Sequence, residues 1–178
     1  RQPQWKEQAA NLTSDIKQQY TSIVNTATKQ NPAWAQWDVQ KSIPQNSGNF
    51  KLYFTPSNED LSKVVQGIPS LTGYLQPVAV RLGINIDYKI PSTATAYLGV
   101  NDRLVVHFSS QQAAQEIQAA VQQWATSNGI TFGQRTHTLG ADSGKTSWGQ
   151  RVANHIAKYA IQYLQSQQYK EDQIALWI

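Results

Sequence analysis

Four side chains that can exchange protons or hold an anion lie on stretches of this sequence that alternate apolar with polar residues. They are Lys51 and Tyr53 on the first stretch, Lys89 on the second and His107 on the third. A neutral lysine amine can remove a proton, and a tyrosine or histidine can donate one to a leaving group. Burying lysine on a half-apolar strand is costly, so these residues indicate acid–base or anion-binding chemistry. A sheet face that is simply solvated is the alternative interpretation.

These side chains share a surface only if the stretches that carry them are strands. Alternation predicts strands over 50–54 and 84–90, and the apolar stretch 103–108 is predicted to be a third strand, with a short candidate at 130–132. In the first strand, Lys51 and Tyr53 lie on the face opposite the one that carries Phe50 and Leu52. We expect Lys51 and Lys89 to meet across neighbouring strands.

Apolar residues at spacings of three and four predict helices around these strands. The predicted helices cover 5–27, a short piece near 34–39, 57–67, 70–82, 110–128 and 147–166. Gly67 and Pro69 are expected to interrupt the chain between the third and the fourth, and Gly83 to end the fourth. Residues 43–49 and 133–145 are rich in turn-forming residues and are predicted to be loops.

This order of elements predicts an α+β fold, with a small, mostly antiparallel sheet, packed helices and an N-terminal helical segment. We place the domain boundary in the loop before the first strand. Residues 1–47 then form the N-terminal helical segment, and residues 48–178 form the α+β domain. A doubly wound parallel sheet is the alternative, but the strands are few and widely separated.

Composition excludes several classes of protein. The 178 residues contain no cysteine, which excludes disulfides, thiolate metal sites and a cysteine nucleophile. The net charge of +4 comes from lysines and arginines scattered singly, so nucleic acid is not an expected partner. No apolar run approaches the roughly 18 residues that span a bilayer, so we expect no membrane insertion. The first residue is Arg1, which suggests a processed or trimmed end.

Several familiar motifs are incomplete. The stretch Gly140–Thr146 resembles the phosphate-binding loop of NTPases, but three residues rather than four separate its glycines. His107, His137 and His155 are not spaced as ligands of one metal ion, so we expect no metal site. The adjacent carboxylate pairs suit helix starts better than glycoside hydrolysis. No Gly-x-Ser-x-Gly elbow marks a serine hydrolase.

Short motifs in this chain resemble those of a known enzyme family in order and spacing. The motifs are Phe50-Lys51-Leu52-Tyr53-Phe54, Asp87-Tyr88-Lys89-Ile90, Leu104-Val105-Val106-His107-Phe108 and Ser147-Trp148-Gly149-Gln150-Arg151. They resemble the phosphothreonine lyase effectors delivered by bacterial type III secretion. They are more similar still to the Hop-A effector family and to the lyase components of lanthipeptide synthetases. The resemblance covers residues 48–165.

The resemblance implies a reaction. In that family a lysine removes the α-proton of a phosphorylated serine or threonine, phosphate leaves, and a dehydroamino acid remains, without metal or cofactor. Lys89 corresponds to this base, and Lys51 to a lysine that helps to hold phosphate. Tyr53 stands where the effectors carry a general-acid histidine, and His107 stands where relatives carry tyrosine, so the two roles can be exchanged.

Arginines complete the implied phosphate site. Arg151 corresponds to the phosphate-binding arginine of the family, although it follows Gln150 directly and so comes one position early. Arg103 and Arg135 are further candidates. A guanidinium is suited to this role because it contacts a phosphate at two points.

We therefore expect a cofactor-independent carbon–oxygen lyase that eliminates phosphate from phosphoserine or phosphothreonine. The resemblance implies a phosphorylated peptide or protein substrate, a kinase or leader-peptide-binding protein as partner, and a location in the bacterial cytoplasm or in a host cell. One alternative is a catalytically idle module of the same fold that binds a phosphopeptide or a protein. Another is an unrelated carbohydrate or host-protein binder that uses exposed Trp34 and Trp148.

Overall fold

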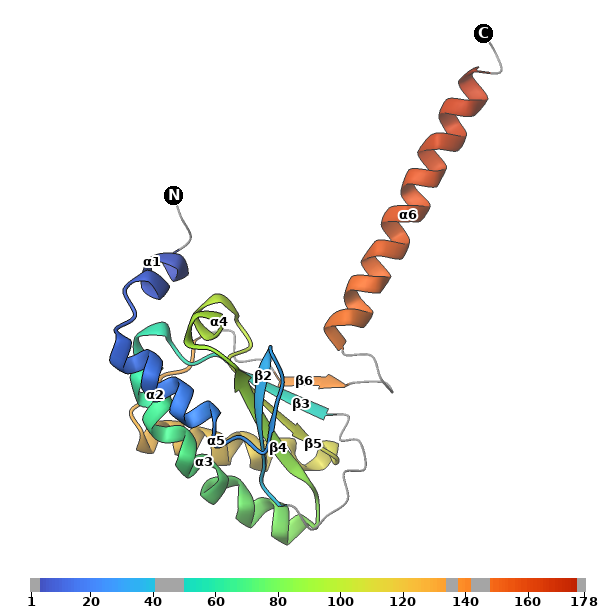
Figure 1. Cartoon of the computed structure of the whole chain (residues 1–178). Coiled ribbons are helices and arrows are strands. Elements are labelled where there is room, and N and C mark those ends of the chain that lie inside the picture. Colours follow the sequence, from blue (N-terminus) through green and yellow to red (C-terminus); the bar gives the residue numbers. More distant parts are fainter. Residues whose placement is uncertain (1–3, 41–49, 134–137, 142–147, 176–178) are drawn as a thin grey trace. The chain divides into compact units, whose positions relative to one another are not determined.

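Six strands form one sheet in the order β1-β2-β4-β5-β3-β6 (Figure 1). The strands are β1 Lys29–Gln30, β2 Trp34–Asp38, β3 Phe50–Phe54, β4 Ile86–Pro91, β5 Leu104–Phe108 and β6 Thr138–Ala141. The four pairs with a defined register, β1–β2, β2–β4, β4–β5 and β5–β3, are antiparallel. The computed structural model describes residues 4–40, 50–133, 138–141 and 148–175.

Six α-helices complete the described fold, which confirms the predicted α+β class with an antiparallel sheet and packed helices. They are α1 Gln4–Ala10, α2 Ser14–Val24, α3 Leu61–Leu82, α4 Ala94–Gly99, α5 Ala114–Ser127 and α6 Trp148–Ala175. Short 3₁₀ turns at Asn58–Asp60 and Gln111–Ala113 lead into α3 and α5. None of the described helices has the length and apolar character needed to cross a bilayer.

The connections between strands place β5 at the centre of the site described below. Strand β5 lies between β3 and β4 and runs antiparallel to both, so β3 and β4 are parallel to each other. Helix α3 links β3 to β4, and α5 follows β5 before the chain returns to the strand beside β3. The order β4-β5-β3-β6 is therefore that of a split β–α–β–β–α–β fold, with the β1–β2 hairpin added next to β4.

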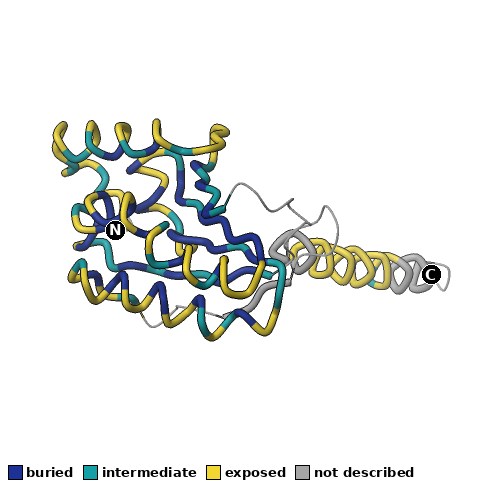
Figure 2. The backbone as a smooth tube through the Cα atoms, turned by 90° about the horizontal axis from the view of Figure 1, so that it is seen from below, coloured by how far each residue is buried: buried dark blue, intermediate teal, exposed yellow. Residues whose placement is uncertain are grey.

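One face of the sheet is apolar and forms the core with α3 and α5. Leu52, Val106 and Tyr88 form one buried row across β3, β5 and β4. The Tyr88 hydroxyl hydrogen-bonds with Thr72 Oγ1 of α3 at 2.9 Å, and Trp124 of α5 is fully buried. Figure 2 shows the buried residues gathered on the strands and on the inner sides of the helices. The apolar face predicted for β3 is confirmed.

The N-terminal part differs from the prediction. Helices α1 and α2 are separate, and Thr13 caps α2 by accepting a hydrogen bond from the Ile16 N–H at 3.3 Å. The predicted short helix after them is wrong: this segment is β2, in which Ala35 and Trp37 alternate into the core. Because β2 pairs with β4, the boundary expected after residue 47 does not separate a helical segment from the sheet. The chain instead forms two compact units, Arg1–Gly140 and Ala141–Ile178.

Three further predictions are corrected by the described residues. Helix α3 continues through Pro69 and Pro77 rather than breaking near Gly67, and it ends at Gly83, whose φ of 62° is the left-handed value predicted for a helix end. Strand β6 falls in a stretch predicted to be a loop. The short strand candidate at 130–132 contributes an isolated bridge to Pro56. The predicted loop at 43–49 lies outside the described residues.

Candidate functional site

The polar face of the sheet gathers the four side chains that the sequence singled out. Cross-strand partners lie on the same face of a sheet. Asp87 of β4 is opposite His107 of β5, which is opposite Lys51 of β3. In the next row of the same face, Lys89 and Tyr53 both lie opposite Val105. The site is therefore a grid of two rows across three strands, and we call it the polar grid.

Lys51 and Lys89 share this face, but not on neighbouring strands as expected. Strand β5 separates them, and they occupy different rows. A strand spacing of about 4.8 Å and a rise of about 3.3 Å per residue put their Cα atoms about 12 Å apart. Two extended lysine side chains can reach a single phosphate from opposite sides across such a distance.

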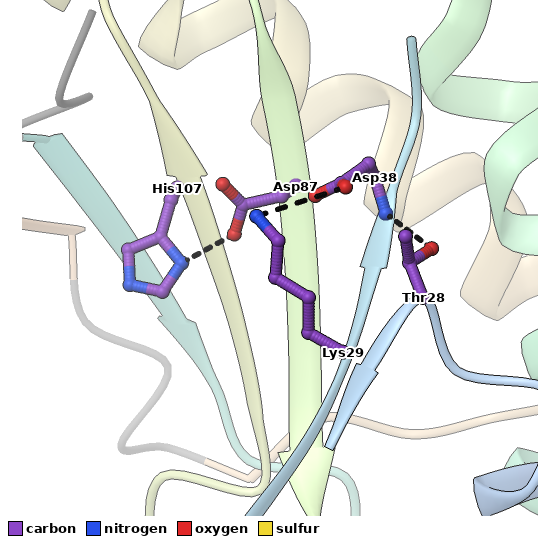
Figure 3. Close-up of polar contacts among 5 residues, drawn as sticks. All are labelled: Thr28, Lys29, Asp38, Asp87 and His107. Atoms are coloured by element: carbon purple, nitrogen blue, oxygen red, sulfur yellow. Dashed lines mark hydrogen bonds and ion pairs between the residues drawn. The ribbon is translucent and has the colours of Figure 1, made fainter. Parts of the chain in front are cut away.

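His107 and Asp87 form the best-defined contact of the polar grid. The His107 Nδ1 atom lies 2.8 Å from Asp87 Oδ1 (Figure 3), and the two side chains are 14% and 10% exposed. A hydrogen bond of this length between mostly buried groups fixes the plane of the imidazole ring. Sequence reasoning selected His107 but missed Asp87, although the alternation of β4 places Asp87 and Lys89 on one face.

The two lysines have different surroundings. Lys51 is buried, with 7% of its surface exposed, and it lies directly opposite His107. Lys89 is half-buried, and its Nζ lies 4.4 Å from the centroid of the Trp34 ring on β2. An aromatic face attracts an ammonium ion, so this contact favours the Lys89 side chain lying against Trp34.

The row of Asp87 continues onto β2. Asp38 lies directly opposite Asp87, and Lys29 Nζ lies 3.8 Å from Asp38 Oδ2 (Figure 3). The backbone N–H of Asp38 donates to Thr28 Oγ1 at 3.2 Å. Like charges directly opposite each other destabilise a sheet. Sequence reasoning missed Asp38 because it read this segment as a helix.

Among the arginine candidates, Arg103 is described by the structure, and it is not part of the polar grid. Arg103 is buried, and its guanidinium donates hydrogen bonds to the backbone carbonyl oxygens of Tyr97, Val100 and Pro56. Burial lowers the pKa of Arg103. Its described hydrogen bonds join the end of α4 to Pro56, and none of them involves a residue of the polar grid.

The other two arginine candidates cannot be placed in the site. Arg135 lies outside the described residues. Arg151 lies on α6 in the second unit, and its side chain is not described. All residues of the polar grid lie in the first unit.

The polar grid combines two cations, a phenol and a carboxylate-bound imidazole. This set can hold an anion and can exchange protons with a substrate. Among the described residues, no group of three or more His, Cys, Asp or Glu side chains is arranged to hold a metal ion.

No protein-family model matches the chain, and neither does any curated protein or any solved structure.

Proposed function

We propose that the protein is a carbon–oxygen lyase that eliminates phosphate from phosphoserine or phosphothreonine in a peptide, leaving a dehydroamino acid. The observation that supports this proposal is the polar grid, which brings Lys51, Tyr53, Lys89 and His107 onto one face across three adjacent strands. A base on one side and an acid with a cation on the other are what such an elimination needs.

In the proposed step, neutral Lys89 takes the α-proton of the phosphorylated residue. The electrons of that C–H bond form the Cα=Cβ double bond, the Cβ–O bond breaks, and phosphate leaves with its electron pair. Tyr53 or His107 supplies a proton to the leaving phosphate, and Lys51 offsets its negative charge. No other reactant is consumed, and proton exchange with solvent restores the enzyme.

The contact between Lys89 and Trp34 bears on this mechanism. Lysine is a base only when neutral, whereas the ring at 4.4 Å attracts the ammonium form. Lys89 must therefore move off Trp34 and lose its proton before it can act. This observation favours a second candidate function, a phosphopeptide-binding module of the same fold in which Lys89 and Lys51 stay charged and only hold phosphate.

Mass spectrometry of phosphopeptides incubated with the whole chain tests the lyase proposal. We expect the wild type to yield peptides lighter by one water than the unphosphorylated form, and Lys89→Ala and Lys89→Arg to yield none. The exposed Lys17→Ala variant is the matched control and should behave as wild type. If the wild type and Lys89→Ala act alike on every phosphopeptide, the lyase proposal is wrong.

Binding measurements separate the second candidate from the first. A binding module retains phosphopeptide without turnover, and its affinity falls as salt rises because the contacts are ionic. Lys51→Met should then lower the affinity for the phosphopeptide and leave the affinity for the unphosphorylated peptide unchanged. Turnover by the wild type would exclude an idle module.

A further inference from the structure

The hydrogen bond between His107 and Asp87 restricts the protonation of the imidazole ring. An ionised carboxylate can only accept hydrogen bonds, so the ring nitrogen that faces it must carry a proton. That nitrogen is Nδ1, at 2.8 Å from Asp87 Oδ1. Nε2 lies on the other side of the ring and is left to exchange protons with a bound molecule.

We propose that Asp87 is a positioning residue that fixes the ring and the Nδ1–H form of His107, and so makes His107, rather than Tyr53, the proton donor to the leaving phosphate. This inference rests on the proposed lyase function. Asp87 touches the imidazole rather than the substrate, and it acts through His107. An imidazolium is a stronger acid than a phenol at neutral pH, so it transfers a proton to phosphate more readily.

The neighbours of the pair suit this role. Lys51 lies directly opposite His107 on β3, where its charge can hold phosphate beside the ring. On the far side, Asp38 is opposite Asp87 and is accompanied by the Lys29 ammonium at 3.8 Å. The imidazole thus hydrogen-bonds a carboxylate on β4, and the residue directly opposite it on β3 is a lysine.

Two readouts test the proposal on the whole chain. The first is the ¹⁵N NMR spectrum of the histidine ring nitrogens, in which the signals of His107 are identified by their loss in His107→Gln. We expect the proton of the neutral ring on Nδ1 in the wild type, and a changed distribution between the two nitrogens in Asp87→Asn. A wild-type ring protonated on Nε2 instead would overturn the proposal, whether or not the protein is a lyase.

The second readout is turnover of a phosphopeptide. A general acid contributes about 10²- to 10⁴-fold, so His107→Gln should lose about that factor. Asp87→Asn should lose at least about tenfold, and Asp87→Glu should recover part of it. Both losses should shrink on a peptide that carries S-nitrophenyl cysteine, because a nitrothiophenolate leaves without needing a proton.

Controls separate positioning from general damage. Asp38→Asn removes the neighbouring carboxylate without touching the imidazole and should lose no more than about threefold. Full turnover in a folded Asp87→Asn, or a larger loss in Tyr53→Phe than in His107→Gln, would overturn the proposal. If the wild type turns over no phosphopeptide, the lyase proposal fails, and the NMR experiment still decides whether Asp87 sets the protonation of His107.

Discussion

The indole N–H of Trp124 donates a hydrogen bond to the backbone carbonyl oxygen of Gly67 at 2.9 Å, and this contact joins α5 to α3. The helices approach so closely here that even a methyl group at Gly67 would crowd its neighbours. A Cβ built on it would lie 3.0 Å from Asn128 Cγ and 3.2 Å from Trp124 Cζ2. Gly67 is therefore a contact point between two helices rather than a helix end.

We predict that Gly67→Ala destabilises the protein. Crowding in a packed interior costs about 1–3 kcal/mol, which outweighs the gain of about 1 kcal/mol from the better helix propensity of alanine. Gly73→Ala on the same helix is the matched control, because nothing lies within 4 Å of its added Cβ. Urea unfolding should show opposite signs for the two variants. A more stable Gly67→Ala would contradict this account of the helix contact.

Tyr20 and Tyr97 allow a matched test of buried hydroxyl groups. Both are buried, but Tyr20 donates to the Pro91 carbonyl oxygen at 2.6 Å, whereas the Tyr97 hydroxyl has no hydrogen-bond partner among the described residues. Burial raises the pKa of both phenols, so both stay neutral. Tyr20→Phe should cost about 1–2 kcal/mol of unfolding free energy, and Tyr97→Phe should cost nothing or stabilise. Equal losses in thermal unfolding would show that Tyr97 is not an unpaired group.

Asp60 should make stability depend on pH at the acid end. The hydrogen bond from Lys63 Nζ at 2.6 Å lowers the pKa of Asp60 against the opposing effect of burial, and the Thr131 N–H at 2.8 Å lowers it further. A lowered pKa in the folded state means that the stabilisation is complete above the unfolded value, near pH 4, and is lost as pH falls through the folded value.

We therefore expect Asp60→Asn to lower the unfolding free energy by about 1–3 kcal/mol at pH 7. The difference from wild type should narrow below about pH 4, as the native carboxylate takes up its proton. Denaturant titrations at a series of pH values measure this. The exposed Asp102→Asn should change stability by less than about 0.5 kcal/mol at neutral pH. If the difference in unfolding free energy between wild type and Asp60→Asn instead grew towards low pH, the pKa of Asp60 would not be lowered in the folded state.

Arg103 and Lys51 should respond oppositely to replacement by methionine. Arg103→Met leaves three backbone carbonyl oxygens without their donor and should cost at least about 2 kcal/mol of stability. A folded sample of it should bind phosphopeptide as wild type does. Lys51→Met removes a buried cation of the polar grid, so a folded sample of it should lose phosphopeptide affinity. If folded Arg103→Met lost phosphopeptide binding, Arg103 would have to take part in binding phosphate.

Local patterns in the sequence, alternation for β3 and β4 and an apolar stretch for β5, were enough to find these strands and to place Lys51 and Tyr53 on the polar face of β3. They failed for β2, because the three-residue spacing of Trp34 and Trp37 imitates a helical turn in so short a segment. They also failed in α3, where burial along the helix outweighs the cost of Pro69. Propensity predicts a break there, and tertiary packing overrides it.

The arrangement of the site could not be predicted from local patterns. Strand β5 could lie at the outer edge of β4 or between β3 and β4. Which of these occurs depends on long-range pairing, which spacing along the chain does not encode. The contact of His107 with Asp87 follows from that pairing and from its register. Residue types therefore indicated which groups are able to exchange protons or hold an anion, but they did not indicate which of these groups are in contact.

The insertion of β5 between β3 and β4 has a consequence for synthesis of the protein. A nascent chain that ends before residue 104 contains both lysines of the polar grid. It lacks β5, the strand that lies between the two strands carrying these lysines. In such a chain the edges of β3 and β4 that will pair with β5 are unpaired. Exposed strand edges can pair with other chains, which leads to aggregation. Lys51 and Lys89 therefore come to lie on one surface only after β5 has been synthesised and has paired with β3 and β4.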